Sequence, residues 1–336
     1  GQWFFPWIFM QTGLSLGHAT VATILLASIA GIIGWFYFFR DYRVNSLVIV
    51  YTLLAILFSR YFIASFQIYT GGGMLEFGIG PWLAVLWKRI ESSPVWLQCL
   101  ILIAAVFTGY FLKSSLLIFW LALIVGRNFS FSINILVIGR IFIFLLAFAL
   151  AKFLFEYTFN YFGPSPISAQ SSFFGGSNIK VTVLLQRFFF TIAAPLLSGI
   201  GVEDYVKYFV QRPGNRLFVE GSLPLVIFYG IAATVMLVCM WRLFQNARVR
   251  ENQYERLLLV VLGVYYAFFL FTFFAGKPVS SFEDSRHFRL AGIMFLPYII
   301  KQFVPNGQLM LRVMFMCMLI YGVLSTLSKV NSSKVV

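Results

Sequence analysis

A few ionisable residues lie at the ends of long apolar stretches in this 336-residue chain, and these are the residues whose types could do chemistry. Glu76 follows the glycines at 71–73, which allow the backbone to turn tightly before an apolar run. Lys113 separates two apolar stretches, and Arg60 lies inside another. A charge at the depth of a membrane is costly unless it is paired or hydrated, so such residues are candidates for function.

A second group lies in the polar stretch 276–289, directly before an apolar run. Its carboxylates and imidazole could accept a proton, position an acceptor or hold a metal, and its guanidinium groups could bind phosphate. We therefore take as candidate catalytic residues Glu76, Glu283, Asp284 and His287. Candidate phosphate-binding residues are Arg60, Lys113, Arg187, Arg286 and Arg289.

Simpler interpretations of the same residues remain open. Glu76 could be a hydrated interfacial acid or could pair with Arg60, and the group at 283–289 could be a solvated loop. Lysines near helix ends can also extend to lipid phosphates. The chain has only two histidines, His18 and His287, and its cysteines are not clustered, so no metal site is predicted. A divalent cation bridging phosphate oxygens stays compatible with the pattern.

The elements that must position these residues are helices in a membrane. The chain is 60% hydrophobic and 11% charged, against about 45–50% and about 25% in soluble domains. This composition excludes a soluble enzyme, a disordered chain and a disulfide scaffold. At about 20 residues per crossing, the apolar residues suffice for about ten transmembrane helices. We therefore predict an all-α, multi-pass bundle of about ten helices with a larger loop region on its outer side.

Ten apolar runs support this count and set the topology. They lie near residues 17–39, 46–66, 77–90, 95–112, 114–126, 137–158, 222–241, 256–275, 288–301 and 309–327. Every second loop between these runs carries basic residues, which predicts that these loops are cytoplasmic and that the N-terminus and the C-terminal tail lie outside. The net charge of +14 is then explained by lipid headgroups, and no nucleic-acid partner is predicted.

The segment 159–221 is too long and too polar to be a turn. It divides the chain into N-terminal membrane helices at 1–158, an outer-side loop region at 159–221 and C-terminal membrane helices at 222–336. Within the loop region we expect a helix that lies in the membrane interface, with Lys180 and Arg187 near headgroups and the phenylalanines at 188–190 in the acyl layer.

The order of these features resembles the GT-C superfamily of membrane glycosyltransferases, which includes aminoarabinose transferases and protein mannosyltransferases. Residues 4–42 are similar to the family's stretch from the first outer loop through the second span. Residues 59–90 resemble the next segment, with an acidic residue at an outer helix start. Three further motifs carry the remaining part of the resemblance, namely GYFLKSSLLIFWLALIVGR, EYTFNYFGPSP and SRHFRLAGIMFLPYII.

The resemblance implies a site on the extracytoplasmic face that uses a polyprenyl-phosphate-linked sugar. It places Lys113 near the donor phosphate and carries over the late Arg-aromatic…Pro element as Arg286, Phe288 and Pro297. The family's acid pair lies in its first outer loop, after a first helix, and we expect the sequence to begin just past that point. The implied location is a bacterial inner membrane, with the site facing the periplasm.

Three other functions compete with glycosyl transfer. A transporter or flippase for an anionic lipid would share the embedded cations but needs a polar path across the bilayer. A polymerase of lipid-linked glycans also fits outer arginines, with a different helix order. A non-catalytic subunit of a larger membrane complex needs no lipid-sized cavity on the outer side, and its partner subunits are not predictable from the sequence.

Overall fold

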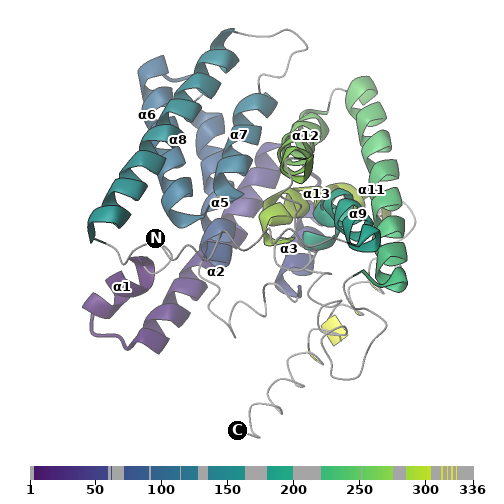
Figure 1. Ribbon diagram of the computed structural model, residues 1–336, viewed down its shortest axis with the longest axis horizontal. Helices are drawn as coiled ribbons and strands as arrows, with labels where there is room; N and C mark the ends of the chain where they lie inside the picture. Colours follow the sequence, from purple (N-terminus) through teal and green to yellow (C-terminus); the bar gives the residue numbers. More distant parts are fainter. Residues whose placement is uncertain are drawn as a thin grey trace, which may run out of the picture.

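The computed structural model describes residues 4–59, 62, 72–90, 92–113, 115–127, 135–162, 180–199, 221–250, 252–274 and 285–303, with five isolated positions after residue 311. Within these residues the chain is all-α (Figure 1). The helices are α1 (Phe4–Gln11), α2 (Leu16–Asp41), α3 (Ser46–Leu57), α5 (Gly72–Ile90), α6 (Val95–Leu112), α7 (Ser115–Arg127), α8 (Ile135–Phe162), α9 (Val181–Ser198), α11 (Leu223–Arg250), α12 (Gln253–Phe274), the 3-10 helix η2 (Ser285–Phe288) and α13 (Arg289–Phe303).

Six of the described helices are long and apolar enough to cross a membrane, namely α2, α6, α8, α9, α11 and α12. The chain is therefore a multi-pass helical membrane protein. Ten runs had been predicted to supply spans. Five of them correspond to the candidate spans α2, α6, α8, α11 and α12, and the run at 77–90 lies in α5, which is not one of the six. Three others contain the short helices α3, α7 and α13, with 12, 13 and 15 residues. At 1.5 Å per residue these helices are shorter than the roughly 30 Å hydrocarbon core. The run at 309–327 lies mostly outside the described residues.

The short helix α13 is part of the protein core. Its residues Leu290–Leu296 are almost completely buried. It packs against α3, α9 and α12, and in Figure 1 it lies between α12 and α9. By contrast, α8 at the opposite edge exposes Phe142, Leu146 and Phe153. Apolar sequence alone does not separate these two environments, because a protein interior and a lipid tail select the same side chains.

Helices α2 and α5 pack closely because small residues line their contact. A Cβ atom placed on Gly31 of α2 would lie 2.3 Å from the ring of Phe77, and one on Gly78 of α5 would lie 2.8 Å from the carbonyl oxygen of Ala27. The Trp82 indole also donates a hydrogen bond to the carbonyl of Ala30 at 2.8 Å. Membrane helices approach closely where such small residues face each other, and this contact fixes the position of Glu76 on α5.

Basic residues of several predicted cytoplasmic loops lie at the same end of the bundle, which we call the inner end. Lys88 at the end of α5 donates to the carbonyl of Asp41 at the end of α2 and lies over the ring of Tyr42. Arg140, near the start of α8, donates to Gln98 of α6 at 2.6 Å and lies over Trp87. The opposite end, where α5 begins and α6 ends, is called the outer end.

Helix α9 occupies the loop region predicted at 159–221. It packs along α11 and α13, and the Tyr266 hydroxyl of α12 donates to the α9 carbonyl of Ile192 at 2.6 Å. Gln186 and Phe190 are fully buried. The interfacial orientation expected for this helix stays a prediction, because its length and composition also suit a membrane-spanning helix. The division of the chain into three regions likewise stays a prediction.

Candidate functional site at the outer end

Glu76 and Lys113 meet at the outer end of the bundle. Glu76 lies in the second turn of α5, and Lys113 is the residue at which α6 ends. Because α5 starts where α6 finishes, the two side chains reach each other across the junction of these helices. Lys113 Nζ lies 2.5 Å from Glu76 Oε2. Gly72 and Gly73 form the first residues of α5, so within the described residues they are helical, and the tight turn expected at the glycines stays a prediction.

This ion pair is buried. The Glu76 side chain is 0% exposed and that of Lys113 is 10% exposed. The second carboxylate oxygen, Glu76 Oε1, is also buried and has no hydrogen-bond partner among the described residues. Buried carboxylate oxygens normally accept hydrogen bonds, and one that does not is a candidate acceptor for a ligand. The pairing with Lys113 was not predicted, since hydration or Arg60 had been considered for Glu76.

Aromatic packing holds the start of α13 against α12. Tyr265 of α12 is fully buried. Its ring centroid is 6.2 Å from that of Phe288, and the Phe288 ring lies tilted against that of Phe269 with 4.1 Å between their centroids. The η2–α13 junction, which includes Phe288, is thus held against α12.

The remaining candidate residues fall into three groups. Arg289 and His287 lie at the η2–α13 junction, Arg289 being only 8% exposed and His287 partly exposed, with its ring 6.3 Å from that of Phe269. Arg187 lies on α9, which packs against η2. Outside the described residues lie Arg60, Glu283, Asp284 and the side chain of Arg286. No three metal-binding side chains cluster in the part of the chain that the structure describes.

An apolar groove runs along α5 beside the ion pair. It is a cavity of about 420 Å³ between α1, α2 and α5. Its walls include Leu75, Gly78 and Ile79, and it extends along α5 to Leu86. Glu76 follows Leu75 directly, so the groove and the carboxylate lie on adjacent faces of one helix. An apolar groove of this kind suits a hydrocarbon chain, and the sequence analysis had not identified it.

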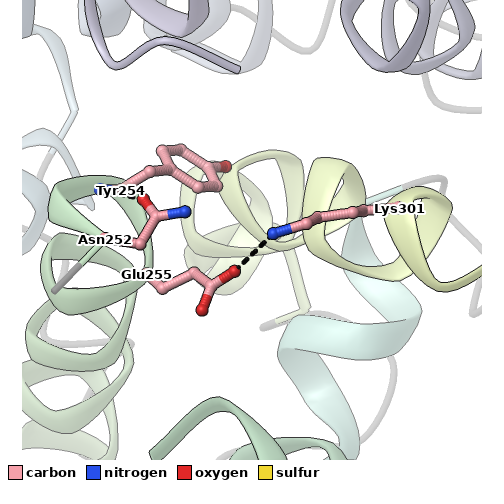
Figure 2. A network of polar contacts seen from close by, with 4 residues as sticks. All are labelled: Asn252, Tyr254, Glu255 and Lys301. Atoms are coloured by element: carbon pink, nitrogen blue, oxygen red, sulfur yellow. Dashed lines mark hydrogen bonds and ion pairs between the residues drawn. The ribbon is translucent and has the colours of Figure 1, made fainter. Parts of the chain in front are cut away.

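A polar cavity at the inner end was also missed. It has a volume of about 540 Å³ and is lined by residues of the α2–α3 turn, α11, the start of α12 and the end of α13. It contains a second lysine–glutamate pair, in which Lys301 Nζ lies 2.8 Å from Glu255 Oε1 (Figure 2). A sequence signal existed, because Glu255 is an acid within a stretch of arginines at 242–256. That stretch had been interpreted only as a basic cytoplasmic loop.

Comparisons with known proteins do not identify a family. No protein-family model, no curated protein and no solved structure matches the chain. The resemblance to GT-C glycosyltransferases therefore stays a prediction from the sequence pattern.

Proposed function

We propose that this protein is a glycosyltransferase that transfers a sugar from a polyprenyl-phosphate donor to an acceptor at the outer end of the bundle. The observation that carries the proposal is the buried Glu76–Lys113 pair, in which Glu76 Oε1 has no hydrogen-bond partner among the described residues. A carboxylate with unused acceptor capacity can take a proton from an acceptor hydroxyl or amine. The adjacent ammonium can interact with a phosphate as a point charge.

The apolar groove on the adjacent face of α5 supports a lipid-linked donor. A prenyl chain lying in the groove that α1, α2 and α5 form, along Leu75, Gly78 and Ile79, would bring its phosphate towards the start of α5. Lys113 lies there, and the Arg289 guanidinium belongs to the neighbouring η2–α13 junction. The hydrocarbon chain and the charged group of one molecule would thus occupy two different surfaces that meet at Glu76.

The reaction would proceed by displacement at the anomeric carbon of the sugar. The acceptor oxygen or nitrogen forms a bond to this carbon, its proton passes to Glu76, and the bond between the anomeric carbon and the phosphate oxygen breaks. The electron pair of that bond leaves with the polyprenyl phosphate. Lys113 and Arg289 would stabilise the negative charge that develops on this leaving group, since fixed charges in a site of low polarity act strongly on a transition state.

Binding of undecaprenyl phosphate, measured by native mass spectrometry of the purified protein, tests the donor site. Wild-type protein should bind this probe more tightly than undecaprenol, which lacks the phosphate. Lys113→Met should weaken binding of the phosphate by about tenfold, the loss expected for one charge-assisted contact. Undecaprenol should bind wild type and K113M equally.

Lys152→Met is the matched control. Lys152 pairs with Glu156 on the exposed face of α8, at 3.7 Å, so its removal takes away a cation without touching the buried pair. The control should bind the probe like wild type. Equal binding of undecaprenyl phosphate and undecaprenol by wild type would overturn the proposal. The proposal would also be overturned if K113M and K152M weakened binding of undecaprenyl phosphate by the same factor.

The catalytic step requires a separate measurement. Release of undecaprenyl phosphate from undecaprenyl-phosphate-linked hexose or aminoarabinose should fall by at least about a hundredfold in Glu76→Gln, since a general base contributes about 10²–10⁴ in rate. Binding of undecaprenyl phosphate should change little. A Glu76→Gln protein that keeps full transfer activity would exclude Glu76 as the base.

A further inference from the structure

The polar cavity at the inner end has the properties of a binding site that glycosyl transfer at the outer end does not use. Three structural units converge on it: the turn between α2 and α3, the pair formed by α11 and the start of α12, and the last turns of α13. Its volume of about 540 Å³ lies within the ordinary range of small-molecule sites. The lining is rich in amides, contributed by Asn45, Gln245, Asn246, Asn252 and Gln302.

The cavity carries an excess of positive charge. Among the described residues, Arg43, Arg242 and Lys301 line it, against one acid, Glu255. Two helices also begin at its wall. Asn45 caps α3 by accepting a hydrogen bond from the Leu47 amide at 2.8 Å, and Asn252 caps α12 by accepting one from the Tyr254 amide at 3.0 Å. Helix N-termini carry partial positive charge and attract anions.

Glu255 supplies an independent indication of a ligand. It is only 2% exposed, and its Oε1 atom is paired with Lys301. Its Oε2 atom is buried and has no hydrogen-bond partner in the described part of the chain. Leaving such an oxygen unsatisfied is costly. Figure 2 shows the carboxylate of Glu255 and the ammonium of Lys301 facing each other, with Asn252 close by. A donor group on a ligand would satisfy the remaining oxygen.

The scaffold around this carboxylate is held firmly. The Tyr254 hydroxyl donates to the carbonyl of Met294 and so joins the start of α12 to α13. The ring of Tyr254 also contacts Phe39 and Tyr42 at the end of α2. Arg43 has a φ of +56°, a conformation that non-glycine residues seldom adopt. Its side chain starts from this constrained turn at the cavity wall.

We propose that the inner cavity binds a phosphate ester of a sugar or polyol. The phosphate would contact Arg43, Arg242 and Lys301, and a ligand hydroxyl would donate to Glu255 Oε2. A bare anion would leave the carboxylate unsatisfied, and a cation would be repelled by the three basic groups. The ligand therefore combines a negative group with hydrogen-bond donors.

Two sources could present this chemistry at the inner end. One is a water-soluble sugar phosphate, and the other is the headgroup of an inositol phospholipid in the adjacent leaflet. Both offer a phosphate ester beside hydroxyl groups, so they share the same recognition. The proposal does not depend on the function suggested for the outer end, since no residue is common to the two sites.

Calorimetric titration of the purified protein in phosphatidylcholine nanodiscs tests the recognition. The probes are inositol 1-phosphate, inorganic phosphate and neutral inositol. Arg242→Gln should weaken both phosphate probes by about tenfold, because it removes a charged contact. Glu255→Gln should weaken inositol 1-phosphate by about fivefold or more and leave inorganic phosphate within about twofold, because only the hydroxyl contact is lost. Inositol alone should bind more weakly than inositol 1-phosphate.

Arg242 lies on the exposed side of α11, so its substitution should not disturb folding. The exposed Lys152→Met on α8 is the control for loss of one positive charge and should bind all probes like wild type. Retention of phosphatidylinositol from mixed nanodiscs by wild type but not by R242Q would assign the site to the lipid headgroup. Binding of inositol 1-phosphate that phosphatidylinositol does not compete with would assign it to a soluble ligand. The proposal would be overturned if wild type neither retained phosphatidylinositol nor bound inositol 1-phosphate. It would also be overturned if wild type, R242Q and E255Q bound inositol 1-phosphate equally.

Discussion

At the scale of residues, Glu76 and Glu255 are related by their environment. Each is buried, each pairs through one oxygen with a lysine on a different helix, and each leaves its second oxygen without a hydrogen-bond partner among the described residues. They lie at opposite ends of the bundle and differ in the exposure of the lysine, which is 10% for Lys113 and 46% for Lys301. Breaking the outer pair should therefore lower the free energy of unfolding more than breaking the inner pair.

A double-mutant cycle measures this effect. Glu76→Gln leaves the Lys113 ammonium largely buried beside a neutral amide, which should lower the free energy of unfolding by on the order of 3 kcal/mol. In the double variant E76Q/K113M both charges are absent, and most of that loss should be recovered. Unfolding by SDS in mixed micelles gives the free energies. Independent, additive effects of the two substitutions would contradict a direct interaction.

At the scale of elements, the close approach of α9 and α13 holds the start of α13 in place. The two helices meet at Gly199 and Gly292. A Cβ atom on Gly292 would lie 2.5 Å from the Gly199 amide nitrogen and 2.7 Å from Ser198 Oγ. Backbone atoms cannot move aside as a flexible side chain can. Any side chain at residue 292 must therefore separate α13 from α9.

Glycine-to-alanine substitutions at two helical positions test this contact. Gly292→Ala should destabilise the protein by about 1–3 kcal/mol because the added methyl overpacks the helix contact. Gly263→Ala on α12 is the matched control, since within the described chain a Cβ at that position meets nothing within 4 Å. It should be neutral or stabilising by up to about 1 kcal/mol through helix propensity. Thermal unfolding midpoints in detergent distinguish the two, and equal midpoints would contradict the close contact.

At the scale of the whole molecule, charge divides the bundle into two ends. Lys88, Arg140, Arg242 and Lys301 lie at the inner end through contacts between different helices. Lys113 and Glu76 lie at the outer end. Positively charged residues near short loops favour the cytoplasmic side, so this arrangement predicts the orientation of the protein in its membrane.

Labelling of single cysteines with a membrane-impermeant maleimide tests the orientation. The native Cys99, Cys239 and Cys317 are first replaced by alanine. Arg43→Cys and Arg242→Cys should then react only after the cells are permeabilised, whereas Lys180→Cys, at the start of α9, should react in intact cells. Reaction of Arg43→Cys and Arg242→Cys from opposite sides would contradict the fold, because both residues line one cavity. If all three cysteines showed the opposite accessibility, the fold would stand and the protein would have the opposite orientation in the membrane.

The sequence by itself determined that this chain is an all-α membrane protein with several spans, because that property depends on composition and on the length of apolar runs. It also identified Glu76 and Lys113 as unusual, since the cost of a charge in an apolar stretch is a local property. Arg289 begins α13 and His287 lies in the 3-10 helix before it, and the functions predicted for both residues stay predictions. Glycosyl transfer stays a prediction, as do the roles of all the candidate catalytic and phosphate-binding residues.

Only the tertiary structure decided which groups meet. Glu76 and Lys113 are 37 positions apart and Glu255 and Lys301 are 46 apart, so each pair exists only because two helices pack side by side. The same holds for the burial of α13 and for the cavity at the inner end, whose walls come from three separate parts of the chain. Hydropathy sums the preference of each residue for an apolar environment, whereas helix packing decides whether that environment is lipid or protein.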